Sequence, residues 1–293
     1  MTTADYLESL QDDLDRTVTA LELEEGTNFT DIADMAENGD ISTGGGGADL
    51  SEYFYTTIDS NTNTNNRALV IKKTSDIIVS DNVTDLSYAF YDLGRYSTSL
   101  PKLIGGNNVK NLSYIFSMGS TSVGPAKTLS IDVSGLITTK VTNMSNMFKD
   151  QTVLTTINGI ENLDTSSVTN MGYLFNNCRS LTTLSFGNSW NVTKVTSMTD
   201  MFNNCVNLTT LDLSTFSTSA LGDTRRMFSG CTSLEKIDMR NFNFSNLSST
   251  NAMFLNVPNN CLIIVKDNTA KTWMNNNFSN LTNVKTVAEY EAE

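Results

Sequence analysis

The sequence predicts an α/β solenoid, because one unit of about 26–27 residues recurs along most of the 293-residue chain. The clearest copies begin at Val141, Val168 and Val195, and every copy carries a phenylalanine at the same place. Successive phenylalanines are 27, 27, 26 and 26 residues apart, at Phe148, Phe175, Phe202, Phe228 and Phe254. A unit of this length cannot bury its apolar side alone, so its copies are expected to stack and share one core.

Two degraded copies precede these. Phe90 in "VTDLSYAF" and Phe116 in "VKNLSYIF" are 26 residues apart, whereas the next step, to Phe148, is 32 residues. The longer step predicts an insertion around "SMGSTSVGPAK". The solenoid is therefore expected to span residues 81–257.

Each unit has two halves with different spacing. In the first half, apolar residues such as Val195, Met198 and Phe202 lie three or four apart, which predicts a short helix. The second half, "LTTLDLS", has the L-x-x-L-x-L spacing of leucine-rich repeats, and its last part alternates like a half-buried strand. The strands of successive coils are expected to form a parallel sheet.

The repeated "VTNMSNMF" and "LTTLDLSTF" segments resemble the BspA-like leucine-rich repeats of bacterial surface proteins and phage structural proteins. The resemblance is strong over residues 141–242. Gln151 departs from it, since the next three coils have Cys178, Cys205 and Cys231 at this place, and "LGDTRRMF" lacks the Val-Thr-x-Met opening. The family implies attachment or assembly by surface contact and offers no catalytic residues.

Composition excludes several classes of protein. The net charge of −13 argues against nucleic acid, because binding phosphate backbones requires clustered Lys and Arg. No apolar run is long enough to insert into a membrane. Histidine, the commonest general base and metal ligand, is absent from the sequence. We therefore expect no enzyme, no cofactor and no metal site.

The four cysteines allow a disulfide, a metal site or simple burial. Cys178, Cys205 and Cys231 each follow the repeat phenylalanine by three residues, so each belongs to a different coil. This placement favours small apolar core groups, because free cysteines are usually buried. Cys261 is out of register and is expected in a terminal strand.

Residues 1–42 predict a helical segment for assembly or anchoring, and residues 43–50 predict a Gly-rich joint. Self-association or docking of the helix and packing on the chain's own body both remain open. The segment "ADYLESLQDDLDRTVTALE" resembles the N-terminal segments of siphophage tail and baseplate proteins. A heptad-like apolar seam would form the contact, at Leu7, Leu10, Leu14, Val18 and Leu21.

Both ends of the solenoid need caps. Residues 51–80 predict an N-terminal β cap, with "EYFYTTI" and "ALVIKKTSDIIVS" as strands around a polar loop. Residues 258–293 predict a strand, helix and strand, with Asp267 as helix cap. Trp273 is expected to plug the last coil, with a ligand-stacking ring as the alternative.

The exposed side chains next to the buried strand positions would form a row across the coils. This row is a candidate face for a glycan or protein, although any soluble sheet face has similar chemistry. Its members are Thr156, Asn158, Thr183, Ser185, Thr210, Asp212, Lys236 and Asp238.

Together these features predict a phage virion structural protein, such as a tail-fibre or baseplate appendage that touches the host surface. It would be made in the bacterial cytoplasm without a signal peptide. Its N-terminal segment would join other virion proteins or form a homo-oligomer, with a trimer as one candidate state. The alternative is a bacterial surface adhesin with BspA-like repeats.

Overall fold

A computed structural model describes two strands at 54–58 and 67–71, and then residues 76–79, 83–91, 94, 98, 100–119 and 126–293. The helical segment predicted for residues 1–42, including the seam from Leu7 to Leu21, lies outside the described residues. The same holds for the Gly-rich joint at residues 43–50. The predictions for this end of the chain therefore stay predictions.

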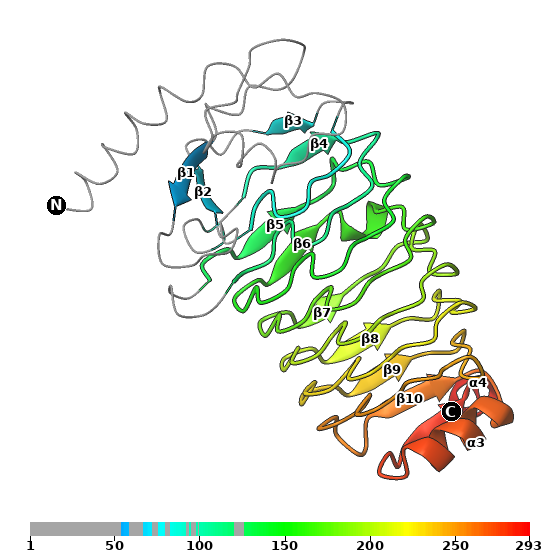
Figure 1. Cartoon of the computed structure of the whole chain (residues 1–293). Coiled ribbons are helices and arrows are strands. Elements are labelled where there is room, and N and C mark those ends of the chain that lie inside the picture. The colour runs from blue at the N-terminus through cyan, green and yellow to red at the C-terminus, as the bar shows by residue number, and fades with distance from the viewer. Residues whose placement is uncertain are drawn as a thin grey trace.

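The described chain forms a rod of stacked coils with short strands along one side (Figure 1). All neighbouring strands of the coils pair in parallel, in the sheets β3-β4, β5-β6 and β7-β8-β9-β10-β11. The predicted solenoid with a parallel sheet is confirmed. Its strands are β3 (Ile77–Val79), β4 (Leu103–Gly105), β5 (Ser130–Asp132), β6 (Thr156–Asn158), β7 (Thr183–Leu184), β8 (Thr210–Asp212), β9 (Lys236–Asp238), β10 (Leu262–Val265) and β11 (Val284–Thr286).

The segment before each strand is a series of tight turns and not the predicted short helix. In the coil of Phe202, the amide of Met201 donates to the carbonyl of Met198, three residues back. The amides of Met198 and Phe202 donate instead to carbonyls of the next coil, at 2.9 Å each. A helix would direct these donors back along its own segment, to residues four positions earlier. Hydrogen bonding between coils therefore replaces the helix.

These turns adopt a left-handed backbone at two places in each coil from Phe148 to Phe254. One position holds Asp150, Asn177, Asn204, Gly230 and Asn256, all with φ between 59° and 77°. Asn, Asp and Gly tolerate this conformation best. The other position holds bulkier residues as well, and we call it the turn column: Tyr88, Tyr114, Asn146, Tyr173, Asp200, Arg226 and Ala252.

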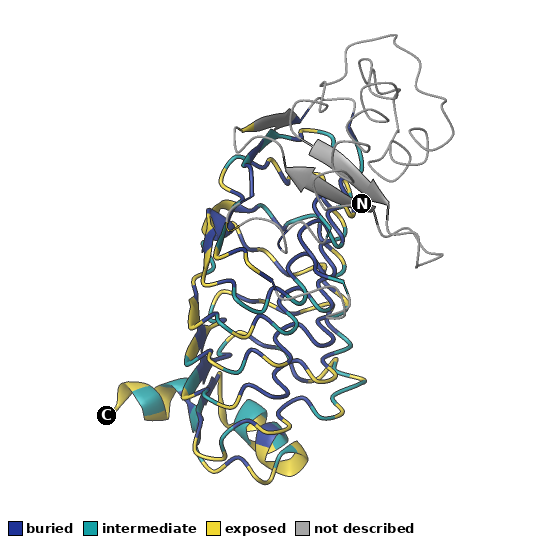
Figure 2. Cartoon of the chain, turned by 90° about the vertical axis from the view of Figure 1, so that its left-hand side faces the viewer, coloured by how far each residue is buried: buried dark blue, intermediate teal, exposed yellow. Residues whose placement is uncertain are grey.

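The core is organised around the repeat phenylalanines, which stack along the rod axis. Neighbouring ring centroids are 5.2–5.8 Å apart from Phe90 to Phe254, and all these rings are buried. Buried residues fill the interior between the strands and the turns (Figure 2). Phe278 ends the stack by packing edge-on against Phe254, at 4.9 Å.

A column of thiols lies beside the phenylalanines. Cys178, Cys205 and Cys231 are buried and free, and each donates its S–H to the phenylalanine carbonyl of the preceding coil, at 3.0–3.1 Å. Gln151 takes the same place and donates its Nε2 to the carbonyl of Phe116, at 2.6 Å. The column is therefore part of the core, as the burial interpretation predicted. Burial raises the pKa of Cys231 to about 12, so this thiol stays protonated at neutral pH.

The N-terminal end of the described chain contains an antiparallel pair, β1 (Phe54–Ile58) and β2 (Arg67–Ile71). The run "ALVIKKTSDIIVS" forms two elements instead of one strand, because β3 follows β2 and pairs in parallel with β4. The first part of this run thus belongs to the hairpin, whereas the second part starts the strand ladder of the solenoid.

The C-terminal end has the predicted strand, helix and strand, as β10, α3 (Asn268–Asn277) and β11. The carboxylate of Asp267 accepts from the amide of Ala270 at 3.0 Å, which confirms the helix cap. Trp273 is half-buried and stacks on Phe244 at 4.9 Å, in the manner of a plug. A further short helix, α4 (Val287–Glu291), begins at a capping box of Thr286 and Glu289.

Candidate functional site

The candidate row lies on the outer side of the strands. The strand positions that alternate with the row are buried, at Ile157, Leu184, Leu211 and Ile237. Thr183, Thr210 and Lys236 are direct neighbours on β7, β8 and β9, and Asp212 is the neighbour of Asp238. Adjacent strands lie about 4.8 Å apart, so the row presents closely spaced hydroxyl and charged groups.

The row is divided in two between β6 and β7. Gly159 has a φ of 78° and leads into a 3-10 turn, η3 (Ile160–Asn162). A Cβ atom on Gly187 would lie 2.2 Å from the carbonyl oxygen of Glu161, so the coils approach too closely here for any other residue. Thr156 and Asn158 consequently belong to the separate β5-β6 sheet, beside Ser130 and Asp132.

The C-terminal end of the row is covered by the short helix α4. The ammonium of Lys236 donates to the hydroxyl of Tyr290 at 2.7 Å and lies 4.5 Å from its ring centroid. Asp238 is buried and forms an ion pair with Arg240 at 2.8 Å, and Arg240 also reaches Glu291. Lys236 and Asp238 are therefore not exposed. The other members of the row remain exposed: Thr156, Asn158, Thr183, Ser185, Thr210 and Asp212.

The paired carboxylates of Asp212 and Asp238 are not arranged as an acid and base couple. Partial burial would raise the pKa of Asp212, but hydrogen bonds from Ser214 and the charges of Arg240 and Lys236 lower it below its ordinary value. A general acid needs a raised pKa. The lowered pKa therefore favours Asp212 as a hydrogen-bond acceptor over Asp212 as a general acid.

A second ladder of polar residues lies at the start of the turns, and the sequence analysis missed it. Asp85, Asn111, Asn143 and Asn170 accept from the backbone amide two residues later, at 2.7–3.0 Å. The same residues form bridges between successive coils. The recurring Asn of "VTNM" was the available signal, because Asn and Asp side chains often form such local turns.

The turn column carries an ion pair between a half-exposed arginine and a buried aspartate. Arg226 binds Asp200 through two hydrogen bonds, at 2.8 and 2.7 Å, across adjacent coils. The side chain of Asp200 is only 3% exposed and also accepts from Asn203 at 2.6 Å. The hydrogen bonds to Asp200 raise the pKa of Arg226. This pair ties two coils together and leaves no free charge at this point.

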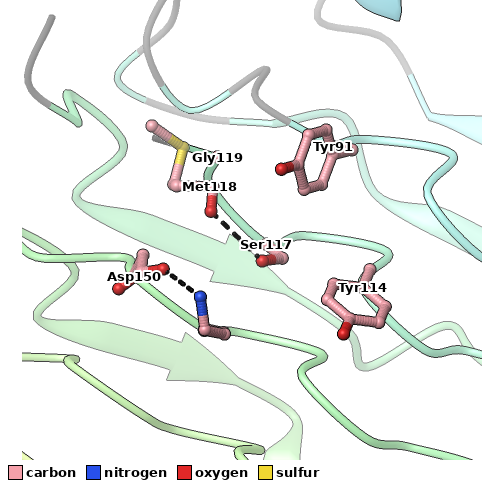
Figure 3. A pocket seen from close by; sticks show the side chains of 7 residues that line it. Tyr91, Tyr114, Ser117, Met118, Gly119 and Asp150 are labelled. Carbon is pink, nitrogen blue, oxygen red and sulfur yellow. Dashed lines mark hydrogen bonds and ion pairs between the residues drawn. The ribbon is translucent and has the colours of Figure 1, made fainter. Parts of the chain in front are cut away.

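In the part of the chain that the structure describes, there are pockets away from the strand face. One, of about 300 Å³, is lined by Tyr91, Tyr114, Lys149 and Asp150 on the turn side of the first coils (Figure 3). The other, of about 540 Å³, lies beside Trp273 and Phe244 at the C-terminal cap. Within the described ranges, no three His, Cys, Asp or Glu residues come close enough to hold a metal ion.

Comparison with known proteins found one family. A model described as "Mycoplasma protein of unknown function, DUF285" matches residues 59–156, 113–210 and 142–266, which together cover more than half of the chain. The chain belongs to the DUF285 family. The second match to DUF285 begins about two repeats after the first, and the third begins about one repeat after the second. Such offsets are expected for a stack of similar coils.

BspA-like repeat proteins belong to DUF285, so this part of the resemblance is confirmed. No curated protein and no solved structure matched the chain. In the described part of this DUF285 protein, no helix is both long enough and apolar enough to cross a membrane. The solenoid fold and the family together indicate a repeat protein of the surface type.

Proposed function

We propose that this protein makes non-catalytic contact with a cell surface through the exposed strand row. The observation that carries the proposal is the register of β7 and β8, which sets Thr183 beside Thr210. Both side chains are exposed, and both strands are held by parallel pairing, so no loop has to become ordered on binding. Hydroxyl and carboxylate groups at this spacing match the hydrogen-bonding groups of a glycan or a polar protein surface.

A charge placed in the row tests this contact. We expect Thr210→Glu to abolish binding of the labelled full chain to a printed array of bacterial and mammalian glycans, because a carboxylate would repel acidic ligands and obstruct neutral ones. Ala220→Glu adds the same charge at another exposed position of this coil and should leave binding intact. Equal binding by both variants would exclude the strand row, and an array without signal would exclude glycans as its ligand.

The more specific proposal is a phage virion structural protein, such as a tail-fibre or baseplate appendage. It is supported by the resemblance of the N-terminal segment to siphophage tail and baseplate proteins. In this proposal, residues 1–42 join other virion proteins or form a homo-oligomer. Several copies would then raise weak individual contacts to a useful avidity through effective concentration.

Assembly through the N-terminal seam can be measured by light scattering after size exclusion. We expect the full chain to form a defined oligomer and the variant Leu10→Asp/Leu14→Asp to be a monomer, because charges would enter the apolar seam. The control Glu8→Gln/Asp12→Asn alters acidic positions that the seam does not use. A monomeric full chain would rule out self-assembly through this segment.

The alternative is a bacterial surface adhesin, which the BspA-like repeats favour. The first proposal places the protein in phage particles, whereas the second places it on bacterial cells. An immunoblot of purified phage particles and of washed cells from the bacterium that carries the gene separates them. Signal in the particles supports the virion appendage, and signal on the cells alone supports the adhesin.

A further inference from the structure

The pocket on the turn side of the first coils has an aromatic wall. Tyr88, Tyr91 and Tyr114 form a cluster in which Tyr88 stacks flat on Tyr114, with centroids 4.6 Å apart and planes 7° apart. Tyr91 packs edge-on against Tyr88 at 5.4 Å. Tyr88 is 42% exposed, so the cluster reaches the surface. Tyr91 and Tyr114 line the pocket itself (Figure 3).

The aromatic stack stops at Tyr114. The next residue of the turn column is Asn146, which has no ring. The following coil contributes Lys149 and Asp150 to the same pocket as Tyr114. A flat apolar surface thus lies next to charged groups.

The backbone of the turn column fixes the position of these rings. Tyr88 and Tyr114 have φ of 61° and 59°, a conformation that bulky residues rarely adopt. Asn146 fills the equivalent place in the next coil with a residue that suits this φ. The same conformation recurs in every coil of the turn column, so it is the side chains and not the backbone that distinguish the pocket.

The polar wall is held in place from two sides. Lys149 Nζ contacts Asp150 Oδ2 at 2.5 Å, and the amide nitrogen of Asn177 donates to Asp150 Oδ1 at 2.8 Å. The side chains of Lys149 and Asp150 are 31% and 21% exposed, so both remain accessible from the pocket. The pocket therefore offers a fixed donor and a fixed acceptor beside an aromatic face.

This combination selects a class of ligand. Tyrosine rings can bind quaternary ammonium groups. Here, however, the carboxylate of Asp150 is already paired with the ammonium of Lys149, so the lining residues offer no unpaired anion to a cation. A neutral ligand with one apolar face and several hydroxyl groups satisfies the ring, the donor and the acceptor together. The pocket volume, about 300 Å³, is at the lower end of small-molecule sites.

We propose that this pocket binds one ring of a neutral hexopyranose, stacked on Tyr114 and hydrogen-bonded to Lys149 and Asp150. The site lies on the turn side of the first coils, away from the strand row. It is therefore independent of the function proposed above, and the two can fail separately.

The test uses the full chain and saturation-transfer NMR with D-glucose, D-galactose, D-mannose and N-acetyl-D-glucosamine. A single ring has few atoms, so we expect a Kd of about 1 mM for at least one sugar. Tyr114→Asn should weaken binding roughly tenfold or more, because it removes the stacking face. Asn146 holds the equivalent position in the next coil, so an asparagine at position 114 should keep the turn.

Tyr173→Asn is the matched control, since Tyr173 occupies the same column with a φ of 60° but does not line the pocket. It should bind like the unaltered chain. Asp150→Asn provides a second test if Tyr114→Asn melts early, because Asn177 and Asn204 hold the equivalent place in the next two coils. Asp150→Asn should also weaken sugar binding, because it removes the charged acceptor.

The proposal is overturned if none of the four sugars gives a signal. It is also overturned if Tyr114→Asn and Asp150→Asn, both folded, bind as well as the control. Binding of choline or adenosine, tested under the same conditions while all four sugars stay silent, would assign the pocket to a cation or an aromatic ring instead.

Discussion

Leu211→Asp is expected to unfold the central coils of the solenoid. Leu211 is 2% exposed at the centre of β8, directly between Leu184 of β7 and Ile237 of β9. An aspartate here would bury a carboxylate without a partner, at a cost on the order of 5 kcal/mol. Because each coil is stabilised by its neighbours, the damage should spread to the adjacent coils. Thermal melting and amide hydrogen exchange would measure both effects.

Thr210→Ala is the control for this variant, since Thr210 is the preceding residue and is exposed. It should change the melting temperature very little. Loss of protection is expected in β7, β8 and β9 of Leu211→Asp, with less change near β11. An unaltered melting temperature for Leu211→Asp would contradict the burial of the strand centre.

Phe202→Ala is expected to have the next largest effect. Phe202 is fully buried between Phe175 and Phe228, with ring centroids 5.6 and 5.8 Å away. Removing the ring leaves a cavity in the middle of the stack, which typically costs about 3–5 kcal/mol. Chemical denaturation monitored by circular dichroism should show a clear fall in the transition midpoint.

Phe186→Ala removes the same ring from a half-buried position beside Trp190, at 4.5 Å. Its loss should be clearly smaller, because solvent already reaches part of this side chain. If the transition midpoint fell equally for Phe186→Ala and Phe202→Ala, the axial stack of phenylalanines would contribute no more stability than ordinary packing.

The sequence alone was sufficient to predict much of this architecture. The repeat of Phe148, Phe175 and Phe202 located the core stack, since residues one coil apart must meet when identical units are stacked. The alternation around Leu211 identified the buried face of the strand and its neighbours. The spacing of Cys178 and Cys205 predicted one core thiol per coil, because each follows the repeat phenylalanine by three residues and free cysteines are usually buried.

The helix predicted for the first half of each unit was wrong for a physical reason. The apolar spacing of Met198, Met201 and Phe202 suits a helix and a series of turns equally well. Which one forms depends on where the backbone amides find acceptors, and here carbonyls of the next coil provide them. The repeated Asn177 and Asn204 were a sign of left-handed turns, but periodicity alone does not distinguish the two.

The candidate surfaces depend even more on the tertiary structure. The sequence determined which side chains alternate with buried strand positions, and hence the composition of the row. Only the folded chain places Tyr290 over Lys236 and joins Arg240 to Asp238, which removes two members from the exposed set. The pocket between Tyr114 and Asp150 likewise arises from residues of different coils, and their proximity depends on how the turns stack. Local pattern thus determined burial along each coil, whereas contacts between coils decided which groups face solvent together.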